Sequence, residues 1–323
     1  MLLNISACQQ HPVVDEWEKY PQRVATLAEK LLDQQINLPP KPQPIAHLPI
    51  GGEKPPAFQL DFLEALSIHS CNLQAYIGEK NSSLGKVQSV ANHFVYEANL
   101  LSQLNDCDYS QADRAAELMR LHKFKQQNWQ LQVDYFLLSS EIHKKLFQPT
   151  TQMLIHDSQG VIEVAAYFKA ANQLVQLPQQ TSEQSTVDNF NKSSGQIHKS
   201  QLLAQYFYTV EYTTQVLQHT ATVLNTLTNH QVCAKARPIE IDYLENVLHN
   251  FFVIKLQAHL ADLSRLQHEL MPTVVQLFNH LSFSPEYFER YLKLDDSSIY
   301  SDFTQANISH QQAWQNLLSS CDK

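Results

Sequence analysis

Glycine is scarce in this chain. Only six of the 323 residues are glycine, whereas an average usage of about 7% would give roughly 22. A phosphate-binding βαβ fold and a turn-rich β-sandwich both need many glycines, so both fold classes are disfavoured. The sequence also lacks a Gly-rich phosphate loop and a Gly-x-Ser-x-Gly nucleophile elbow. We therefore expect no cofactor and no enzymatic activity.

Cysteine is sparse and widely spaced. The five cysteines are an odd number and include no Cys-x-x-Cys pair, which argues for a reducing compartment and against a disulfide framework or a cysteine zinc site. The segment Ile5-Ser6-Ala7-Cys8 resembles a lipoprotein cleavage box, but it lacks a positively charged region and a long apolar stretch. No apolar run approaches the roughly 20 residues that cross a bilayer. We expect a cytoplasmic protein with no membrane contact.

Positive charge is also limited. The net charge is -9 and only six residues are arginine, whereas a domain that holds nucleic acid by neutralising phosphates is normally basic. Any DNA contact would need a local basic patch. Fifteen histidines are present, but the Glu-x-x-His pairs of a di-iron bundle and the His-Glu-x-x-His motif are not. We expect no metal site.

Apolar residues recur at helical spacing along most of the chain. Together with the shortage of glycine, this pattern predicts an all-α protein built from antiparallel helical bundles. The predicted helices span residues 13–35, 58–84, 87–104, 111–147, 201–229, 240–269, 272–281, 285–294 and 306–321.

The predicted domain organisation has two helical parts. Residues 1–150 form the first domain, with a proline-rich connector at 38–57, and residues 201–323 form the second. Residues 151–200 form a linker between them. Within it, residues 153–168 fit either a β-hairpin turning at Asp157-Ser158-Gln159-Gly160 or a helix that begins after Gly160. Residues 177–200 are rich in Gln, Ser, Thr and Asn, which is typical of a flexible loop.

One sequence pattern occurs twice, roughly 180 residues apart. Each copy contains an apolar-Asp-aromatic-Leu-Glu segment, then Leu-Gln-Ala, and about fifty residues later a glutamine pair followed by tryptophan. This order predicts a tandem duplication of one helical unit. The matching segments are Leu60–Glu64 with Ile241–Glu245, Leu73–Ala75 with Leu256–Ala258, and Gln126–Trp129 with Gln311–Trp314.

Basic and aromatic residues alternate between positions 120 and 145. Such a surface serves single-stranded nucleic acid, because cations follow the phosphates and rings stack on the bases. The alternative is that the rings belong to the core and the lysines only solvate the outer face of a helix. The candidate binding residues are Arg120, Lys123, Lys125, Trp129, Tyr135, Lys144 and Lys145.

The chain resembles the PriC family of bacterial primosomal replication-restart proteins. The resemblance rests on Leu60-Asp61, on Leu73-Gln74-Ala75 with Glu79, on a second helix from Val90 to Leu104, and on a Gln-rich segment whose aromatic is Trp129 or Tyr135. It implies a helical, non-enzymatic adaptor. Its implied partners are single-stranded DNA, the acidic C-terminal tail of the single-stranded-DNA-binding protein, and the replicative helicase, whose loading it would assist.

The resemblance also suggests how a tail would bind. The arginines that receive the tail in the family have no counterpart here, so this role falls to Lys123, Lys125, Lys144 or Lys145. We expect an apolar and cationic pocket near Trp129 that buries the last aromatic residue of the tail and pairs its carboxylate with lysine. The alternative is an all-helical interaction module, such as an assembly or immunity protein, with no DNA role.

Overall fold

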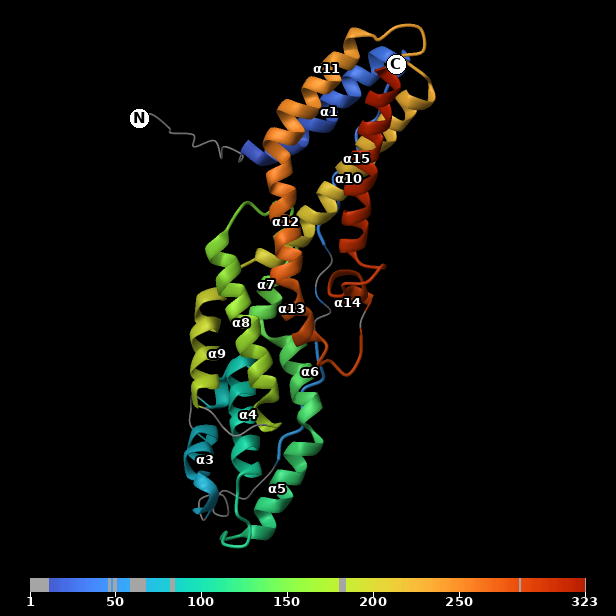
Figure 1. Cartoon of the computed structure of the whole chain (residues 1–323). Coiled ribbons are helices and arrows are strands. Elements are labelled where there is room, and N and C mark those ends of the chain that lie inside the picture. The colour runs from blue at the N-terminus through green and yellow to red at the C-terminus, as the bar shows by residue number, and fades with distance from the viewer. Residues whose placement is uncertain are drawn as a thin grey trace, which may run out of the picture.

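The computed structural model describes residues 12–45, 48, 51–58, 68–81, 85–179, 184–284 and 286–322. All regular structure in these ranges is helical, which confirms the all-α prediction. Figure 1 shows an elongated molecule whose longer helices run mostly along one axis. We call its two ends the upper and lower bundles, as drawn there.

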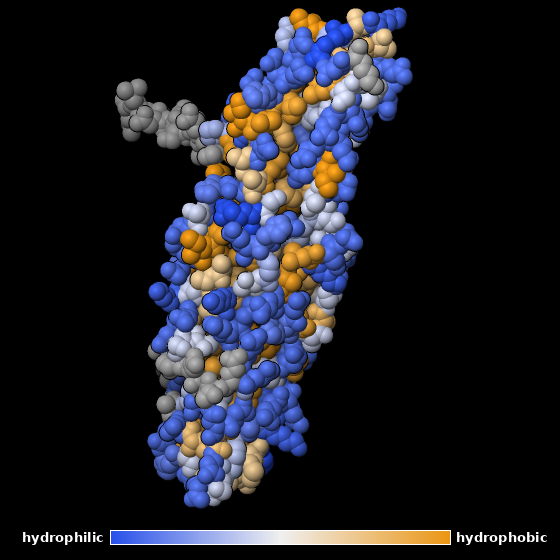
Figure 2. Space-filling view, viewed as in Figure 1, coloured by the Kyte–Doolittle hydropathy of each residue, from blue (hydrophilic) through white to orange (hydrophobic). Residues whose placement is uncertain are grey.

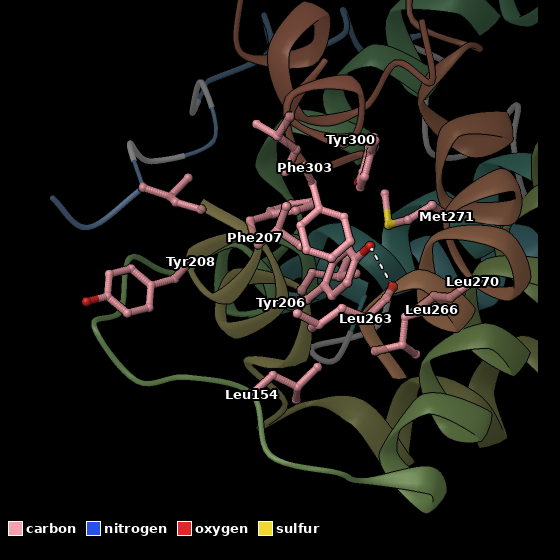
Figure 3. Packing of buried hydrophobic residues seen from close by; sticks show 14 of the residues in the cluster. Leu154, Tyr206, Phe207, Tyr208, Leu263, Leu266, Leu270, Met271, Tyr300 and Phe303 are labelled. Carbon is pink, nitrogen blue, oxygen red and sulfur yellow. Dashed lines mark hydrogen bonds between the residues drawn. The ribbon is translucent and has the colours of Figure 1, made fainter. Parts of the chain in front are cut away.

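The upper bundle contains the first helix of the chain and most of the C-terminal half. It comprises α1 (Pro12–Leu32), α10 (Leu202–Asn229), α11 (Ile239–Val247), the π-helix η4 (Leu248–Leu256), α12 (Gln257–Glu269) and α15 (Ile299–Cys321). The α11, η4 and α12 segments follow one another without a break. Figure 3 shows the packing of α10 against α12 and α15, where the Tyr206 hydroxyl donates a hydrogen bond to the Leu263 carbonyl over 3.3 Å.

The lower bundle is built from shorter helices. It comprises η1 (Ser70–Asn72), α3 (Gln74–Asn81), η2 (Gly85–Val87), α4 (Val90–Asn105), α5 (Ala115–Gln127), α6 (Trp129–Ser139), α7 (Glu141–Leu146), α8 (Ser158–Gln176), η3 (Leu177–Gln179) and α9 (Gln184–Ile197). Helices α13 (Met271–Phe278) and α14 (Glu286–Tyr291) lie between the two bundles.

Residues 158–176 form a helix, so the β-hairpin considered for residues 153–168 is wrong. The Asp157 side chain accepts a hydrogen bond from the Gly160 N–H at 2.9 Å and caps the helix. Aspartate and glycine near one another also suit a β-turn, which is why the sequence left both readings open. The helix buries Val164, Tyr167 and Phe168 on one face.

The predicted flexible loop at 177–200 is also wrong for residues 184–197, which form α9 and pack on α8. The segment has few aliphatic residues, but Val187, Phe190 and Ile197 fall on one helical face and are buried. A narrow apolar stripe is enough to dock a helix, and average composition does not reveal it. Residues 180–183 lie outside the described residues.

Helix α1 packs against α10, α11 and η4 of the C-terminal half. Trp17 donates its Nε1–H to His259 Nδ1 over 2.9 Å, and Tyr20 shares a 2.7 Å hydrogen bond with His310 Nε2. Trp314 donates its Nε1–H to the Tyr20 hydroxyl at 3.0 Å. One large apolar cluster runs from Trp17 to Cys321. The main core therefore does not divide at the predicted linker.

The described parts of the proline-rich connector have no regular secondary structure, as predicted. Ile45 and Leu48 are nevertheless buried in the main core. Gly52 is pressed against α6: a Cβ there would lie 2.8 Å from the Tyr135 Cα atom. Only glycine permits this approach. The connector is thus fixed along the body of the molecule.

Four of the five cysteines form two disulfides, so the expectation of unpaired cysteines is wrong. Cys71 is bonded to Cys107 and Cys233 to Cys321, with Cα atoms 5.2 and 5.1 Å apart. Helix packing, not local spacing, brings these distant residues together. Because Cys233 follows α10 and Cys321 ends α15, both helices end at the same side and run parallel, which departs from the predicted antiparallel arrangement. Cys8 lies outside the described residues.

The two copies of the repeated pattern lie in different local structures. Leu73 follows a 3₁₀ turn in which Cys71 and Asn72 have left-handed φ angles of 59° and 55°, so the predicted helix 58–84 is wrong there. Leu256 lies within a continuous helical run. Trp314 is in the middle of α15, whereas Trp129 begins α6. The residues of the segment 60–64 lie outside the described part of the chain. The described segments give the predicted duplication no support.

We expect acid to destabilise the protein through its buried histidines. Burial lowers the pKa of His143 to about 4 and of His310 to about 3, from 6.5. Below pH 6.5 the unfolded chain therefore binds protons that the folded chain does not. The free energy of unfolding is therefore highest above pH 6.5. It falls as the pH decreases towards 4, by about 1.4 kcal/mol per pH unit for each histidine.

Urea unfolding between pH 6.5 and 5 measures this loss before most carboxylates titrate. H310Q should reduce the change of the unfolding free energy with pH by the contribution of one histidine. H230Q, at an exposed site, should leave this change as it is in the wild type. A free energy of unfolding that does not vary over this range would contradict the expectation.

The disulfides should stabilise the fold measurably. Cys71–Cys107 closes a chain separation of 36 residues and Cys233–Cys321 one of 88. Replacing both Cys233 and Cys321 by serine should lower the free energy of unfolding by about 3 to 5 kcal/mol, since the unfolded chain regains its freedom. Urea unfolding gives the change, and C8S is the matched control. Non-reduced peptide mapping that finds these cysteines as free thiols would refute the pairing.

Candidate functional site

The lower bundle contains a cavity of about 480 Å³. Its wall comes mainly from α3, α4, α5 and α6 and from residues 54–58 at the end of the connector and just after it. This volume falls within the range of small-ligand pockets, roughly 300 to 1,000 Å³. The cavity lies away from the upper bundle, at the end where Figure 1 shows α3, α4 and α5.

A second, smaller apolar cluster surrounds this cavity. Its seven buried members are Ile68, Leu73, Tyr96, Leu100, Leu104, Leu118 and Leu121, and all of these except Leu104 and Leu118 line the cavity. Protein interiors are normally packed to crystal density, and unfilled apolar space costs free energy. A small core that stays open on one side is therefore suited to receive an apolar group.

One buried carboxylate organises the charges of the cavity. Glu97 of α4 is only 2% exposed, and its Oε2 lies 2.5 Å from Lys125 Nζ. Lys80 Nζ and His93 Nε2 each lie 3.8 Å from Oε1. A buried carboxylate needs partners of this kind, because its desolvation costs several kcal/mol. Glu97 thus holds Lys125 deep in the wall, with Lys80 nearby.

The cavity has a surplus of positive charge. Among the described residues, its lining contains Lys54, Lys80 and Lys125 but only one acidic residue, Glu97. Burial lowers the pKa of His93 to about 4, so this histidine is neutral at neutral pH. Burial also lowers the pKa of Lys80, and Lys125 and Lys54 lower it further while Glu97 opposes them. Three lysines therefore face one carboxylate.

The structure brings only Lys125 and Tyr135 of the predicted site residues to this cavity. The predicted helix 111–147 is three helices, α5, α6 and α7, interrupted at Asn128 and Ser140. Arg120 and Lys123 are exposed on α5.

The remaining predicted site residues lie elsewhere. Trp129 is partly buried and stacks on Phe94, with ring centroids 5.2 Å apart. Lys144 and Lys145 belong to α7 and do not line the cavity, and Lys145 bonds Gln148 over 2.7 Å. The predicted basic and aromatic residues therefore do not share one continuous face.

Sequence reasoning missed Lys54, Lys80, His93 and Glu97. One signal was available, since His93 and Glu97 are four residues apart on a helix and Glu97 interrupts an otherwise apolar face. A charged residue at such a position indicates a paired or functional group. Lys54 comes from the irregular connector, and no local pattern points to it.

Two further observations concern membranes and metal ions. In the described part of the chain, no helix is both long and apolar enough to cross a bilayer. The same residues contain no group of three or more histidine, cysteine, aspartate or glutamate side chains placed to hold a metal ion.

The face shown in Figure 2 is largely hydrophilic, with apolar side chains gathered mainly over part of the upper bundle.

Comparison with known proteins finds one family. A family model described as "Protein of unknown function (DUF3080)" matches residues 17–323, which is nearly the whole chain. No curated protein and no solved structure matches. The match assigns no ligand or activity, so both must be inferred from the structure.

The Glu97–Lys125 pair should be costly to break from one side. K125M leaves the Glu97 carboxylate without its nearest partner in a site where both side chains are largely buried, 3% and 11% exposed. We expect the free energy of unfolding to fall by about 3 to 5 kcal/mol.

The double variant E97Q/K125M should recover much of this loss, because no unpaired buried charge remains. K123M, on the exposed face of α5, is the control and should change stability by less than about 0.5 kcal/mol. Urea unfolding of the wild type, E97Q, K125M and E97Q/K125M gives the coupling energy. Additive effects of the two cavity substitutions would show that the pair does not interact.

Proposed function

We propose that this chain, which belongs to the DUF3080 family, is a non-enzymatic binding protein whose lower cavity takes an apolar ligand with an anionic end. The observation that carries this proposal is the hollow apolar cluster with three lysines and one glutamate on its wall. Ligand pockets commonly combine apolar walls with a few convergent polar groups.

The walls and the charges have separate roles in binding. The apolar side chains of α4 and α5 favour ligands that remove apolar surface from water. Glu97 lies 2.5 Å from Lys125 and 3.8 Å from Lys80. One carboxylate thus faces three lysines, and the surplus positive charge can attract an anion at Lys80 and Lys54. Charge-assisted hydrogen bonds from lysine then fix the orientation of the ligand.

We further propose that the protein works in an oxidising compartment. Two disulfides join residues far apart in the chain, and such bonds persist outside the cytosol but are rare within it. This location does not suit replication restart, although it keeps the binding chemistry expected for an acidic peptide end. Non-reducing electrophoresis of protein trapped with a thiol-blocking reagent in its own cells would test the location.

Binding of single-stranded DNA has less support than binding of a small anionic ligand. Trp129 is stacked on Phe94, and Tyr135 lines the cavity. Stacking on successive bases requires exposed rings beside the cations that follow the phosphates. Neither ring lies in this way beside the exposed cations of α5. Interaction with the tail of the single-stranded-DNA-binding protein or with a helicase is likewise a hypothesis that rests on the sequence resemblance alone.

A fluorescent amphiphilic anion, anilinonaphthalenesulfonate, tests the cavity directly. We expect the folded, oxidised chain to bind about one equivalent, with fluorescence rising as the dye leaves water. L100W and the milder L121F fill the space that these side chains line and should weaken binding at least tenfold. L227F, in the main core, is a control for general loosening.

Thermal unfolding of each variant, measured in parallel, identifies those that remain folded. Dye binding that is weak, or that folded cavity variants retain unchanged, would count against the proposed function. Oligo-dT and a peptide ending in Asp-Ile-Pro-Phe, titrated at low salt, separate the DNA and tail hypotheses from binding of a small ligand.

A further inference from the structure

We propose that the natural ligand is a single-chain fatty acid, with its aliphatic chain in the lower cavity and its carboxylate at Lys54 and Lys80. This inference rests on the proposed function and names the ligand class. It follows from how deeply the charged and apolar side chains of the cavity are buried, and from which ligand groups the lining residues can contact.

The charged groups of the cavity lie at two depths. Glu97 and Lys125 are deep, with side chains 3% and 11% exposed, and they satisfy one another. Lys80 is 42% exposed and Lys54 is also exposed. These outer lysines influence one another electrostatically, since Lys54 contributes to lowering the pKa of Lys80. The surplus of positive charge over the single carboxylate is therefore on the more exposed side of the cavity, whereas the apolar cluster is buried.

The interior wall suits a hydrocarbon chain. Its apolar part is formed by Leu73, Leu100, Leu121 and the ring of Tyr96, all buried, and lies beside the polar side chains of the same wall. Two amide side chains, Gln88 and Gln132, also reach the wall, and the amide nitrogen of Gln88 donates to Glu79. A methylene chain requires no hydrogen-bond partner of its own, so the apolar part of the wall can receive it without burying an unpaired polar group of the ligand.

A peptide is less well matched to the same wall. Its backbone N–H and C=O groups need partners once they leave water. The wall is largely helical, and helices use their own backbone groups internally. The described ranges contain no strand to whose edge a peptide could add. A peptide is thus limited to placing its last side chain inside, whereas a fatty acid can extend its chain through the cavity.

The size of the cavity points to one chain. A space of about 480 Å³ is in the lower part of the range for drug-sized ligands. A two-chain lipid would have to leave one chain outside. A free fatty acid, with one chain and one negative charge, matches the volume and the two outer lysines.

Displacement of the bound fluorescent dye from the full, oxidised chain tests this proposal. The competitors are octanoate, dodecanoate and hexadecanoate, below their aggregation limits, together with the methyl ester of dodecanoate. We expect affinity to rise by up to about fourfold for each added CH₂ until the chain outgrows the cavity. The methyl ester should bind at least tenfold more weakly than the acid, because it offers no charge to the lysines.

Matched lysine variants locate the carboxylate. K54Q/K80Q should weaken dodecanoate binding at least tenfold and leave the methyl ester within about twofold. K235Q is the control, since Lys235 is exposed near the Cys233–Cys321 disulfide of the upper bundle, and it should change neither affinity. Equal losses for acid and ester in K54Q/K80Q would overturn the assignment of the carboxylate to these lysines.

The possible failures are distinguishable. If a short peptide ending in phenylalanine displaces the dye and fatty acids do not, the fatty-acid proposal is overturned and the proposed function stands. If the dye binds with no dependence on the cavity-filling substitutions, the proposed function itself fails. Affinity that does not change between octanoate and dodecanoate would also refute a chain buried in the cavity.

Discussion

The docking of α1 into the C-terminal half is the constraint on which the path of the chain depends. Trp17 and Tyr20 are fully buried and hydrogen-bonded to His259 and His310. The first helix is therefore held in the upper bundle, while the next helices build the lower one (Figure 1). The connector must return along the molecule, and its close approach to α6 at Gly52 fixes its position. Lys54 reaches the cavity as a result.

The two clusters of the protein treat buried polar groups differently. The main core uses neutral pairs: His259 accepts from Trp17 and its other nitrogen donates to the Leu154 carbonyl at 2.9 Å. Such pairs satisfy hydrogen bonding without burying charge. The lower cluster instead contains the Glu97–Lys125 ion pair, which costs more to desolvate than an apolar substitute. Stability alone does not explain a buried ion pair there, and we relate it to the proposed ligand site.

Long periodic segments could be predicted from the sequence, because their apolar spacing depends only on neighbours along the helix. The prediction of residues 201–229 matches α10 almost residue for residue. Features set by contacts between distant residues could not be predicted from the sequence. The Cys233–Cys321 bond follows from the packing of α10 beside α15, and α9 is stable because Phe190 finds a place against Phe136 and Tyr167. The local sequence around Cys233 or Phe190 does not show which distant residues these side chains will contact.

The candidate site was only partly predictable for the same reason. A helix periodicity places Lys125 and Trp129 on one face, but the interruption at Asn128 begins a new helix and directs Trp129 towards Phe94. The disulfide of the lower bundle, Cys71–Cys107, lies beside the cavity. Cys71 and Cys107 both pack against the cluster that lines it, and Cys71 is two residues from Leu73 of the wall. The Cys71–Cys107 bond fixes a segment that lines one side of the cavity, so the proposed location and the proposed binding site depend on the same bond.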